Sequence, residues 1–412
     1  MIKTISASLY CESIFDGTHD TPQPSNNGYP LVTSKHISSG TMDFSTAYLI
    51  SEEDFKEINK RSKVSQWDIL FSMIGTVGEV YLEKNQHVGY AIKNIGVFSC
   101  KDEKRAKWLY YYLKSPAAKT HINRYLNGAV QKFLSLGGLR EFPVLPFDEK
   151  GSQGINLISA LDAKIELNNR INAELEAMAK TLYDYWFVQF DFPFDFALGK
   201  PAANGKPYKS SGGKMIYNPI LKREIPEEWK VKRLSEIANI TMGQSPDGES
   251  YNKDGRGTIF FQGSTDFGWL FPTVRQFTTA PTRMAKKGDI LLSVRAPVGD
   301  INIANNDCCI GRGLAALNSK VGYDGFLFYV MKYFKQVFDR RNSEGTTFGS
   351  ITKNDLHSLE LAYPDDALLQ RYDGVVANYN KMIFKRSLEN QQLIELRDWL
   401  LPMLMNGQVT VK

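Results

Sequence analysis

The stretch Gly199-Lys-Pro-Ala-Ala-Asn-Gly-Lys-Pro207 is the nearest that the sequence comes to a phosphate-binding loop. Such a loop needs four residues between its glycines and a Ser or Thr after the lysine, because that hydroxyl binds magnesium. Here five residues separate the glycines, and Pro207 replaces the hydroxyl. A nuclease-like pattern at Pro246-Asp247, followed by Glu249 and Lys253, has the wrong spacing between acid and lysine. Both stretches are interpreted as loops.

Other catalytic and metal-binding patterns are missing from the sequence. The five histidines are scattered, and no His-x-x-x-His, Cys-x-x-Cys or Gly-x-Ser-x-Gly motif occurs. There is no Pro-Pro dipeptide, so the Asn/Asp-Pro-Pro-aromatic motif of amino-methyltransferases is missing. Adjacent Cys308 and Cys309 suit buried apolar positions better than a disulfide. We therefore predict no catalytic residue, no metal site and no cofactor in this chain, and a reducing, cytoplasmic location.

Composition is that of a globular protein with two or more domains. The chain has 412 residues, of which 42% are hydrophobic and 23% charged. No apolar run is long enough to span a membrane, and the N-terminus does not resemble a secretory signal. The net charge of +5 permits a polyanionic partner without requiring one.

One stretch of the sequence occurs twice. Residues 65–83, SQWDILFSMIGTVGEVYLE, align without a gap with residues 286–304, KKGDILLSVRAPVGDINIA. Asp68 matches Asp289 and Gly78 matches Gly299, both at an offset of 221 residues. A repeat with so long a period indicates two copies of a whole domain. We interpret the two glycines as turn residues.

The elements around the repeated stretch are also duplicated. Each copy is followed by an aromatic-rich helical pattern, at 106–126 and 324–342, and then by a short apolar strand. A turn-rich segment precedes each copy. Alternating strands and helices predict a mixed α/β module of roughly 140 residues.

A long helix is predicted after each module, over 154–187 and 366–404. The first carries a stripe made of Ile158, Leu161, Ile165, Leu175 and Leu182, which Asn168 and Asn172 interrupt. The second carries Leu369, Tyr372, Val376, Tyr379 and Ile383, and its stripe resumes at Leu393, Leu396 and Leu400; Pro402 and Gly407 are expected to end it. Narrow seams over so many turns predict a coiled coil, with two ordinary core helices as the alternative. Since neither helix can bury its seam alone, we expect antiparallel packing with one module at either end. The segment 191–219 between the halves is expected to be an irregular connector.

Twin modules on a rigid spacer, without a catalytic constellation, favour a reader of a polymer over an enzyme. DNA presents sites at fixed spacing, and dimeric readers use half-sites about one turn, roughly 34–36 Å, apart. Because the two modules differ in sequence, the two half-sites could differ too.

The chain resembles the DNA-specificity subunits of type I restriction–modification enzymes over essentially its whole length. The resemblance lies in the duplicated Asp-Ile-Leu…Val-Gly turns, in the segments 175–187 and 396–407, and in Gly205-Lys-Pro-Tyr208 and Ile225-Pro-Glu-Glu-Trp229 of the connector. It implies a mixed α/β fold with two target recognition domains separated by two long antiparallel helices, in pseudo-two-fold symmetry. We place the domains at 1–150 and 223–365, the helices at 151–190 and 366–412, and the connector at 191–222. The first module lacks a counterpart of 227–230, so we expect its N-terminal edge to be less completely built.

The resemblance also implies partners. These are double-stranded DNA with a split, asymmetric target, two methyltransferase subunits and two restriction subunits, with no membrane. S-adenosylmethionine, ATP and magnesium would belong to those subunits. Apolar residues near the helix ends exceed what one helix pair can cover and are predicted to dock partners: Leu182, Tyr185, Trp186, Leu396, Trp399 and Leu400.

Loop residues that can hydrogen bond to bases or phosphates are the candidates for DNA contact. In the first module these are Thr18, His19, Lys35, His36, Gln131 and Lys132, and in the second Gln262, Ser264, Thr265, Arg295, Arg312 and Thr347. The alternative for each is an ordinary solvated loop side chain.

Two other classes of function stay open. One is a coiled-coil adaptor that binds only protein, for which DNA affinity would be absent or independent of sequence. The other is a stand-alone DNA-modifying enzyme with degenerate motifs, which would methylate or cleave DNA by itself.

Overall fold

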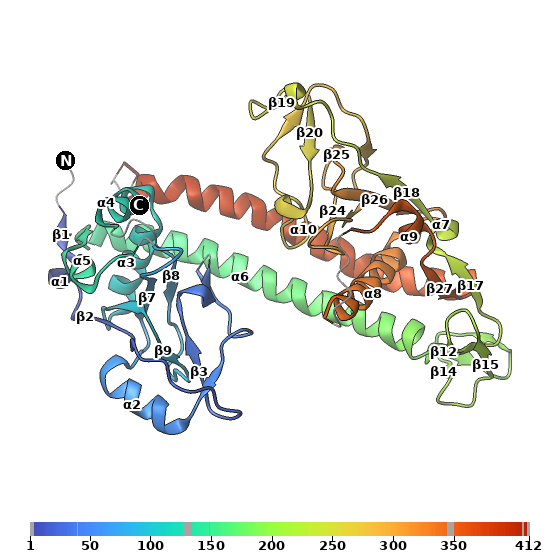
Figure 1. Ribbon diagram of the computed structural model, residues 1–412, viewed down its shortest axis with the longest axis horizontal. Coiled ribbons are helices and arrows are strands. Elements are labelled where there is room, and N and C mark those ends of the chain that lie inside the picture. The colour runs from blue at the N-terminus through green and yellow to red at the C-terminus, as the bar shows by residue number, and fades with distance from the viewer. Residues whose placement is uncertain are drawn as a thin grey trace. The chain divides into compact units, whose positions relative to one another are not determined.

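The computed structural model describes residues 4–38, 40–126, 133–147, 149–343, 350–405 and 408–409 (Figure 1). The chain forms two compact units, Met1–Leu167 with Glu389–Lys412, and Asn168–Leu388, called unit 1 and unit 2 below. The division falls inside both long helices, α6 (Glu149–Tyr183) and α10 (Asp366–Met405), so each helix contributes one part to each unit. No helix in the described part of the chain is both long and apolar enough to cross a membrane.

Unit 1 contains an antiparallel sheet in the order β2-β10-β7-β8, with a helix packed on it. The strands are β2 (Ser13–Asp16), β10 (Ile95–Ser99), β7 (Asp68–Ser72) and β8 (Val80–Leu82), and helix α3 (Glu103–Lys114) packs against β7 and β8. A second sheet has the order β6-β3-β9, with β6 (Leu49–Ile50), β3 (Tyr29–Val32) and β9 (Ala91–Ile92). In it, β3 and β9 run parallel.

Unit 2 repeats this topology with different sequence. Its antiparallel sheet has the order β18-β26-β23-β24, formed by β18 (Ala238–Met242), β26 (Leu314–Ser319), β23 (Ile290–Ser293) and β24 (Ile301–Ile303). Helix α8 (Asp324–Ser343) packs against β26. The second sheet again pairs two strands in parallel, β20 (Thr258–Phe261) and β25 (Cys308–Ile310). The predicted duplication of the module is therefore present in the strand pairing.

An aspartate and a glycine shared by the two repeated stretches have matching local roles in both units. The Asp68 carboxylate accepts a hydrogen bond from the Ser65 N–H at 2.8 Å, and Asp289 accepts one from the Lys286 N–H at the same distance. Gly78 and Gly299 have φ of 100° and 90°, a region that favours glycine. Both glycines are turn residues, as predicted. The residues shared by the two copies of the repeat thus form the turns on either side of one strand.

The two helices of unit 1 contribute to one core. Residues 149–167 of α6 and 389–405 of α10 run antiparallel, since Asp162 pairs with Arg397 at 2.9 Å and Lys164 with Glu389 at 3.5 Å. Ile155 and Ile158 join the same buried cluster as Leu401, Leu404 and Met405. The prediction that Pro402 ends this helix is wrong, because α10 continues through it to Met405. The ring removes one late hydrogen bond, and the packed side chains on both sides of it hold the last turn. Gly407 lies outside the described residues.

The two helices of unit 2 also run antiparallel. Tyr372 donates a hydrogen bond to the Ala179 carbonyl at 3.2 Å, and Asn172 Nδ2 donates to Ser387 Oγ at 3.4 Å. Asn168 and Asn172 are buried with the apolar stripe, as their positions in the pattern require. Helix α6 continues as a π-helical turn over Asp184–Val188, whose Trp186 and Phe187 enter the core around Tyr372.

Three further segments can be compared with their predicted structure. The predicted helix at 106–126 is split into α3 and α4 (Pro116–Tyr125), because Pro116 begins α4 after the capping Ser115. The connector contains short hairpins. The stretch that resembles a phosphate-binding loop contains β13 (Lys200–Pro201) and β14 (Lys206–Pro207), and both strands pair with β12 (Pro193–Asp195). The N-terminal edge of unit 1 is present but short, with a two-residue β1 (Ile5–Ser6) where unit 2 has the four-residue β17 (Lys230–Arg233).

Candidate functional site

A polar pocket in unit 2 contains four of the residues predicted to contact DNA. Its volume is about 340 Å³, and its lining includes Gln262, Ser264, Thr265 and Arg295. These side chains come from two loops, one after β20 and one after β23. The structure therefore brings together residues that are separated by about 30 positions in the sequence.

Arg312 lies in the loop after β25, next to Gly313, which lines the same pocket. Because β20 and β25 run parallel, both strands end at the same edge. Gln262 follows β20 directly, and Arg312 lies two residues after the end of β25. Gly311 allows this approach, since a Cβ on it would lie 2.8 Å from Gln262 Oε1.

Ser245 joins the side chains of this edge and was missed in the sequence. Its hydroxyl accepts a hydrogen bond from Gln262 Nε2 at 2.9 Å and lies 3.4 Å from Arg312 Nε. It also accepts from the Arg312 backbone N–H at 3.3 Å. A serine in a polar loop carries no distinguishing pattern, so only the pairing of β18 with β26 reveals its position.

The arginines of this edge differ in whether the guanidinium is paired with a carboxylate of the protein. Arg275 is held by the Asp266 carboxylate and donates to the Thr265 carbonyl. Arg295 and Arg312 are exposed, and neither forms an ion pair with any residue the structure describes. An exposed guanidinium without a carboxylate keeps its charge and its forked donors for an anionic or hydrogen-bonding partner.

The same loop framework occurs in unit 1. The Thr18 N–H donates to the Ile92 carbonyl at 3.0 Å, as the Gln244 N–H does to Ile310 in unit 2. The Lys93 N–H donates to Val32, as Gly311 does to Phe261, both at 2.8 Å. In this correspondence His19 takes the place of Ser245, Thr33 that of Gln262, and Asn94 that of Arg312. The repeated stretches likewise place Ile74 where unit 2 has Arg295.

Side chains in the unit 1 framework make different contacts from their unit 2 counterparts. His19 is exposed and lies 2.7 Å from Asn94 through its Nδ1, while Lys35 is exposed at the end of the neighbouring loop. Asn94 was not among the predicted residues, although an isolated asparagine after a strand gives little signal. Thr18 uses its hydroxyl to accept from the Asp20 N–H at 3.1 Å.

His36 is buried and is not an exposed contact residue, which corrects the expectation. Only 3% of it is exposed, and its Nδ1 accepts a hydrogen bond from the Thr33 N–H at 2.8 Å. Burial, and then the nearby Lys35 charge, lower the pKa of the imidazole. The residue closes the turn after β3. The predicted residues Gln131, Lys132 and Thr347 lie outside the described residues.

Only part of the predicted docking set is on the surface. Tyr185, Leu396 and Trp399 are exposed by 38%, 42% and 63%. Leu182 and Leu400 are partly buried, and Trp186 is buried in the unit 2 core with its ring 6.0 Å from Tyr372. The expectation for Trp186 is therefore wrong, because this side chain of the π-helical turn packs into the core of unit 2. Leu396 was also predicted to belong to the buried stripe of α10, but it is exposed.

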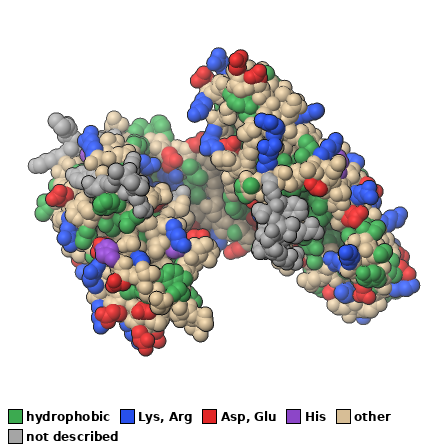
Figure 2. All heavy atoms as spheres, viewed as in Figure 1, with side chains coloured by type: hydrophobic (Ala, Val, Ile, Leu, Met, Phe, Trp, Pro, Cys, Tyr) green, Lys and Arg blue, Asp and Glu red, His purple; other side chains and the backbone are tan. Residues whose placement is uncertain are grey.

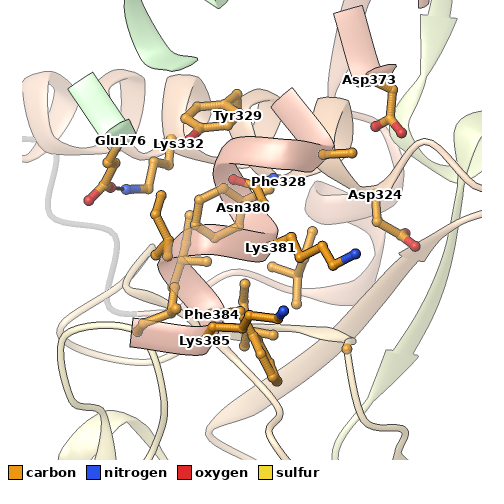
Figure 3. Close-up of a pocket in the computed structure, with 18 of the residues that line it drawn as sticks. Glu176, Asp324, Phe328, Tyr329, Lys332, Asp373, Asn380, Lys381, Phe384 and Lys385 are labelled. Carbon is orange, nitrogen blue, oxygen red and sulfur yellow. Dashed lines mark ion pairs between the residues drawn. The ribbon is translucent and has the colours of Figure 1, made fainter. Parts of the chain in front are cut away.

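Unit 2 has a second, larger cavity of about 580 Å³ between α8, α10 and the sheet (Figure 3). Its walls include Ile290, Ile301 and Phe384, and Lys332 and Glu176 point toward one another as an ion pair. Of the residues predicted to contact DNA, none that the structure describes lines this cavity.

Positive and negative side chains are mixed on the face drawn in Figure 2, where Lys and Arg are interspersed with Asp and Glu. In the described part of the chain, no group of three or more His, Cys, Asp or Glu residues is placed to hold a metal ion. The loop edges are identified by their hydrogen-bonding side chains, such as Gln262 and Ser245 in unit 2.

Comparisons with known proteins agree with this description. A family model described as the type I restriction modification DNA specificity domain matches residues 21–177 and 226–371, one match for each copy of the module. The chain is 29% identical to the protein predicted to be the specificity subunit of the MjaX type I restriction enzyme of Methanocaldococcus jannaschii, over 93% of this chain and 88% of that protein. It is 24% identical to the MjaIX specificity subunit of the same organism, over 88% and 82%.

A solved structure supports the fold. The crystal structure of the S subunit of a type I restriction-modification system from M. genitalium superposes with a TM-score of 0.57, at 16% identity, over 98% of this chain and 95% of that one.

Proposed function

Because the chain belongs to the family of the type I restriction modification DNA specificity domain, we propose that it is the non-catalytic DNA-recognition subunit of a type I restriction–modification complex. In this proposal its two modules read the two halves of a split, asymmetric DNA sequence. The observation that carries it is the duplicated loop framework. Equivalent loops present His19, Thr33 and Asn94 in unit 1, and Ser245, Gln262 and Arg312 in unit 2.

The chemistry of these side chains supports direct reading of bases. Arginine, glutamine and asparagine can each make paired hydrogen bonds to a base edge in the major groove, and serine can make one. A common framework would dock both modules on DNA in the same way, while unlike side chains would select unlike bases. The target is therefore expected to be asymmetric.

The long helices would set the length of the unread gap. Within each unit the parts of α6 and α10 pack antiparallel through specific contacts, such as Asp162 with Arg397 and Asn172 with Ser387. We propose that the pair is a coiled coil that relates the two modules by pseudo-two-fold symmetry. A helix rises about 1.5 Å per residue, so its length would be translated into base pairs.

Two methyltransferase subunits would dock on the exposed apolar side chains near the helix ends. Tyr185 in unit 2 and Trp399 in unit 1 occupy matching positions, 214 residues apart (399−185), and both are exposed. Leu396 adds apolar surface beside Trp399 on the same helix. Two restriction subunits would join this assembly. In this proposal S-adenosylmethionine, ATP and magnesium bind to the partner subunits.

Exchange of residues 1–150 for the first module of another family member tests the proposal. The exchanged chain is expressed with its cognate methyltransferase, and methylated sites are mapped across the genome. We expect one half of the target to change while the other half and the gap stay the same. Methylation that changes in both halves, or in neither, would refute independent reading, and DNA binding without sequence preference would favour a protein adaptor.

A further inference from the structure

Asn94 ends a chain of contacts that begins at a helix of unit 1. Arg61 of α2 (Glu52–Ser62) lies 3.3 Å from one oxygen of the Asp16 carboxylate, which is 8% exposed. The other oxygen lies 3.2 Å from His19 Nε2, and His19 Nδ1 lies 2.7 Å from Asn94 Oδ1. A buried carboxylate therefore orients the imidazole, and the imidazole orients the amide.

The backbone of Asn94 is also fixed in an unusual conformation. Its φ is +53°, in the left-handed region that few residues other than glycine adopt and that asparagine tolerates best. The Asn94 N–H donates to the Thr18 carbonyl at 3.2 Å, and the Asn94 carbonyl accepts from Ser34 Oγ at 3.3 Å. Both the main chain and the side chain are thus held before any ligand arrives.

The outer face of this amide is left for a partner. The residue is partly exposed, and no described residue accepts a hydrogen bond from its Nδ2. Its place in the loop framework is that of Arg312 in unit 2, because the flanking backbone bonds are equivalent. The same edge therefore presents a guanidinium in one unit and a carboxamide in the other.

We propose that Asn94 reads an adenine in the half of the DNA target bound by unit 1, and that Asp16, His19 and Arg61 position it. A carboxamide offers a donor and an acceptor side by side, which match adenine N7 and N6 in the major groove, whereas arginine matches guanine O6 and N7. The inference rests on the proposed function and adds to it the base recognised at one position.

The first test removes the amide without disturbing the backbone. Asn94→Gly keeps a residue that accepts the left-handed conformation. We expect discrimination for adenine to fall by about 5- to 150-fold at a single position of the unit 1 half-site, as for the loss of one paired contact. Methylation mapping in cells that carry the variant and its cognate methyltransferase measures this. The half-site read by unit 2 is an internal control.

A second variant changes the chemistry of the contact. Asn94→Asp keeps the shape but offers only acceptors, so we expect adenine to be lost and cytosine, which donates from N4, to be favoured at that position. A split motif from the native chain is the result that the proposed function requires. If Asn94→Gly then retains full adenine discrimination at every position of that motif, this inference fails while the proposed function stands.

The positioning role of His19 has its own readout. His19→Ala should weaken discrimination at the same position as Asn94→Gly, with the rest of the motif unchanged. The double variant should show no further loss there, because both changes remove one interaction. Equal weakening for all sequences would instead assign His19 to the DNA backbone and overturn its place in the chain of contacts.

Discussion

Arg312 and Arg295 are exposed at the loop edge of unit 2, and neither forms an ion pair with a residue that the structure describes. If either pairs with guanine, its replacement by alanine should weaken binding by about 1–3 kcal/mol and relax specificity at one position. Binding of the assembled complex to the target duplex and to single-base variants measures this. Arg256→Ala is a matched control, since Arg256 is exposed but paired with Asp254 at 3.3 Å. A loss that is equal for all sequences would assign the arginine to phosphate, and no loss would return it to the solvated surface.

The buried imidazole of His36 should make unit 1 sensitive to acid. Its pKa is lowered, first by burial, and its Nδ1 must stay unprotonated to accept from Thr33. Because the folded pKa lies below the unfolded value of about 6.5, the stabilisation is complete above that pH and is lost as the pH falls below it. We expect the decrease in Tm between about pH 7 and 5 to be smaller in His36→Asn, whose amide oxygen can accept the same bond.

A second histidine provides the comparison for this experiment. The pKa of His121 is also lowered, first by burial and then by Arg124. His121→Asn has no hydrogen bond equivalent to that of His36 with the Thr33 N–H to preserve. Comparison of the two variants therefore separates the contributions of His36 and His121 to the decrease in Tm at low pH. If Tm falls with pH as steeply in His36→Asn as in the native chain, protonation of His36 does not limit stability.

At the scale of elements, α6 is predicted to act as a ruler. Insertion of four residues after Glu174 lengthens it by about 6 Å and turns the downstream face by about 40°. That length is close to two base pairs, at roughly 3.4 Å each. The contacts of Asn172 with Ser387 and of Ala179 with Tyr372 place residues near Asn380 opposite the insertion. A paired insertion after Asn380 therefore keeps the helices matched.

Methylation mapping of the paired variant should show the same half-sites with a wider gap. The matched control places the same four residues after Gly212, an open turn of the connector where a Cβ would meet nothing within 4 Å. The control should leave the gap unchanged. Full activity of the paired variant with an unchanged gap would mean that the helices do not set the spacing.

At the scale of the whole molecule, Trp399 and Tyr185 are each predicted to dock one of the two methyltransferase subunits. A buried tryptophan at an interface often contributes at least about 2 kcal/mol, or roughly 30-fold in affinity. We expect Trp399→Ala to leave one methyltransferase tightly bound and the double variant with Tyr185→Ala to leave none. Native mass spectrometry of the reconstituted complex counts the copies. Tyr217→Ala, which removes another exposed aromatic residue, should retain both, and two tight copies in the double variant would contradict the assignment.

Features that depend on local pattern could be predicted from the sequence. The repeat of Asp68 and Gly78 at Asp289 and Gly299 predicted two similar modules, because a turn and a strand need the same residues wherever they occur. The stripes of α6 and α10 predicted long helices with one buried face. Missing motif spacings argued against a catalytic site without reference to any fold.

Which side chains meet could not be predicted without the tertiary structure. His19 and Asn94 are 75 residues apart, and Ser245 and Arg312 are 67 apart, yet each pair is in contact because strands distant in sequence end at one edge. Burial was equally inaccessible to local pattern, since His36 and Trp186 were expected outside and lie inside. Contacts of this kind depend on long-range strand pairing and packing, whereas periodicity reports only on neighbours along the chain.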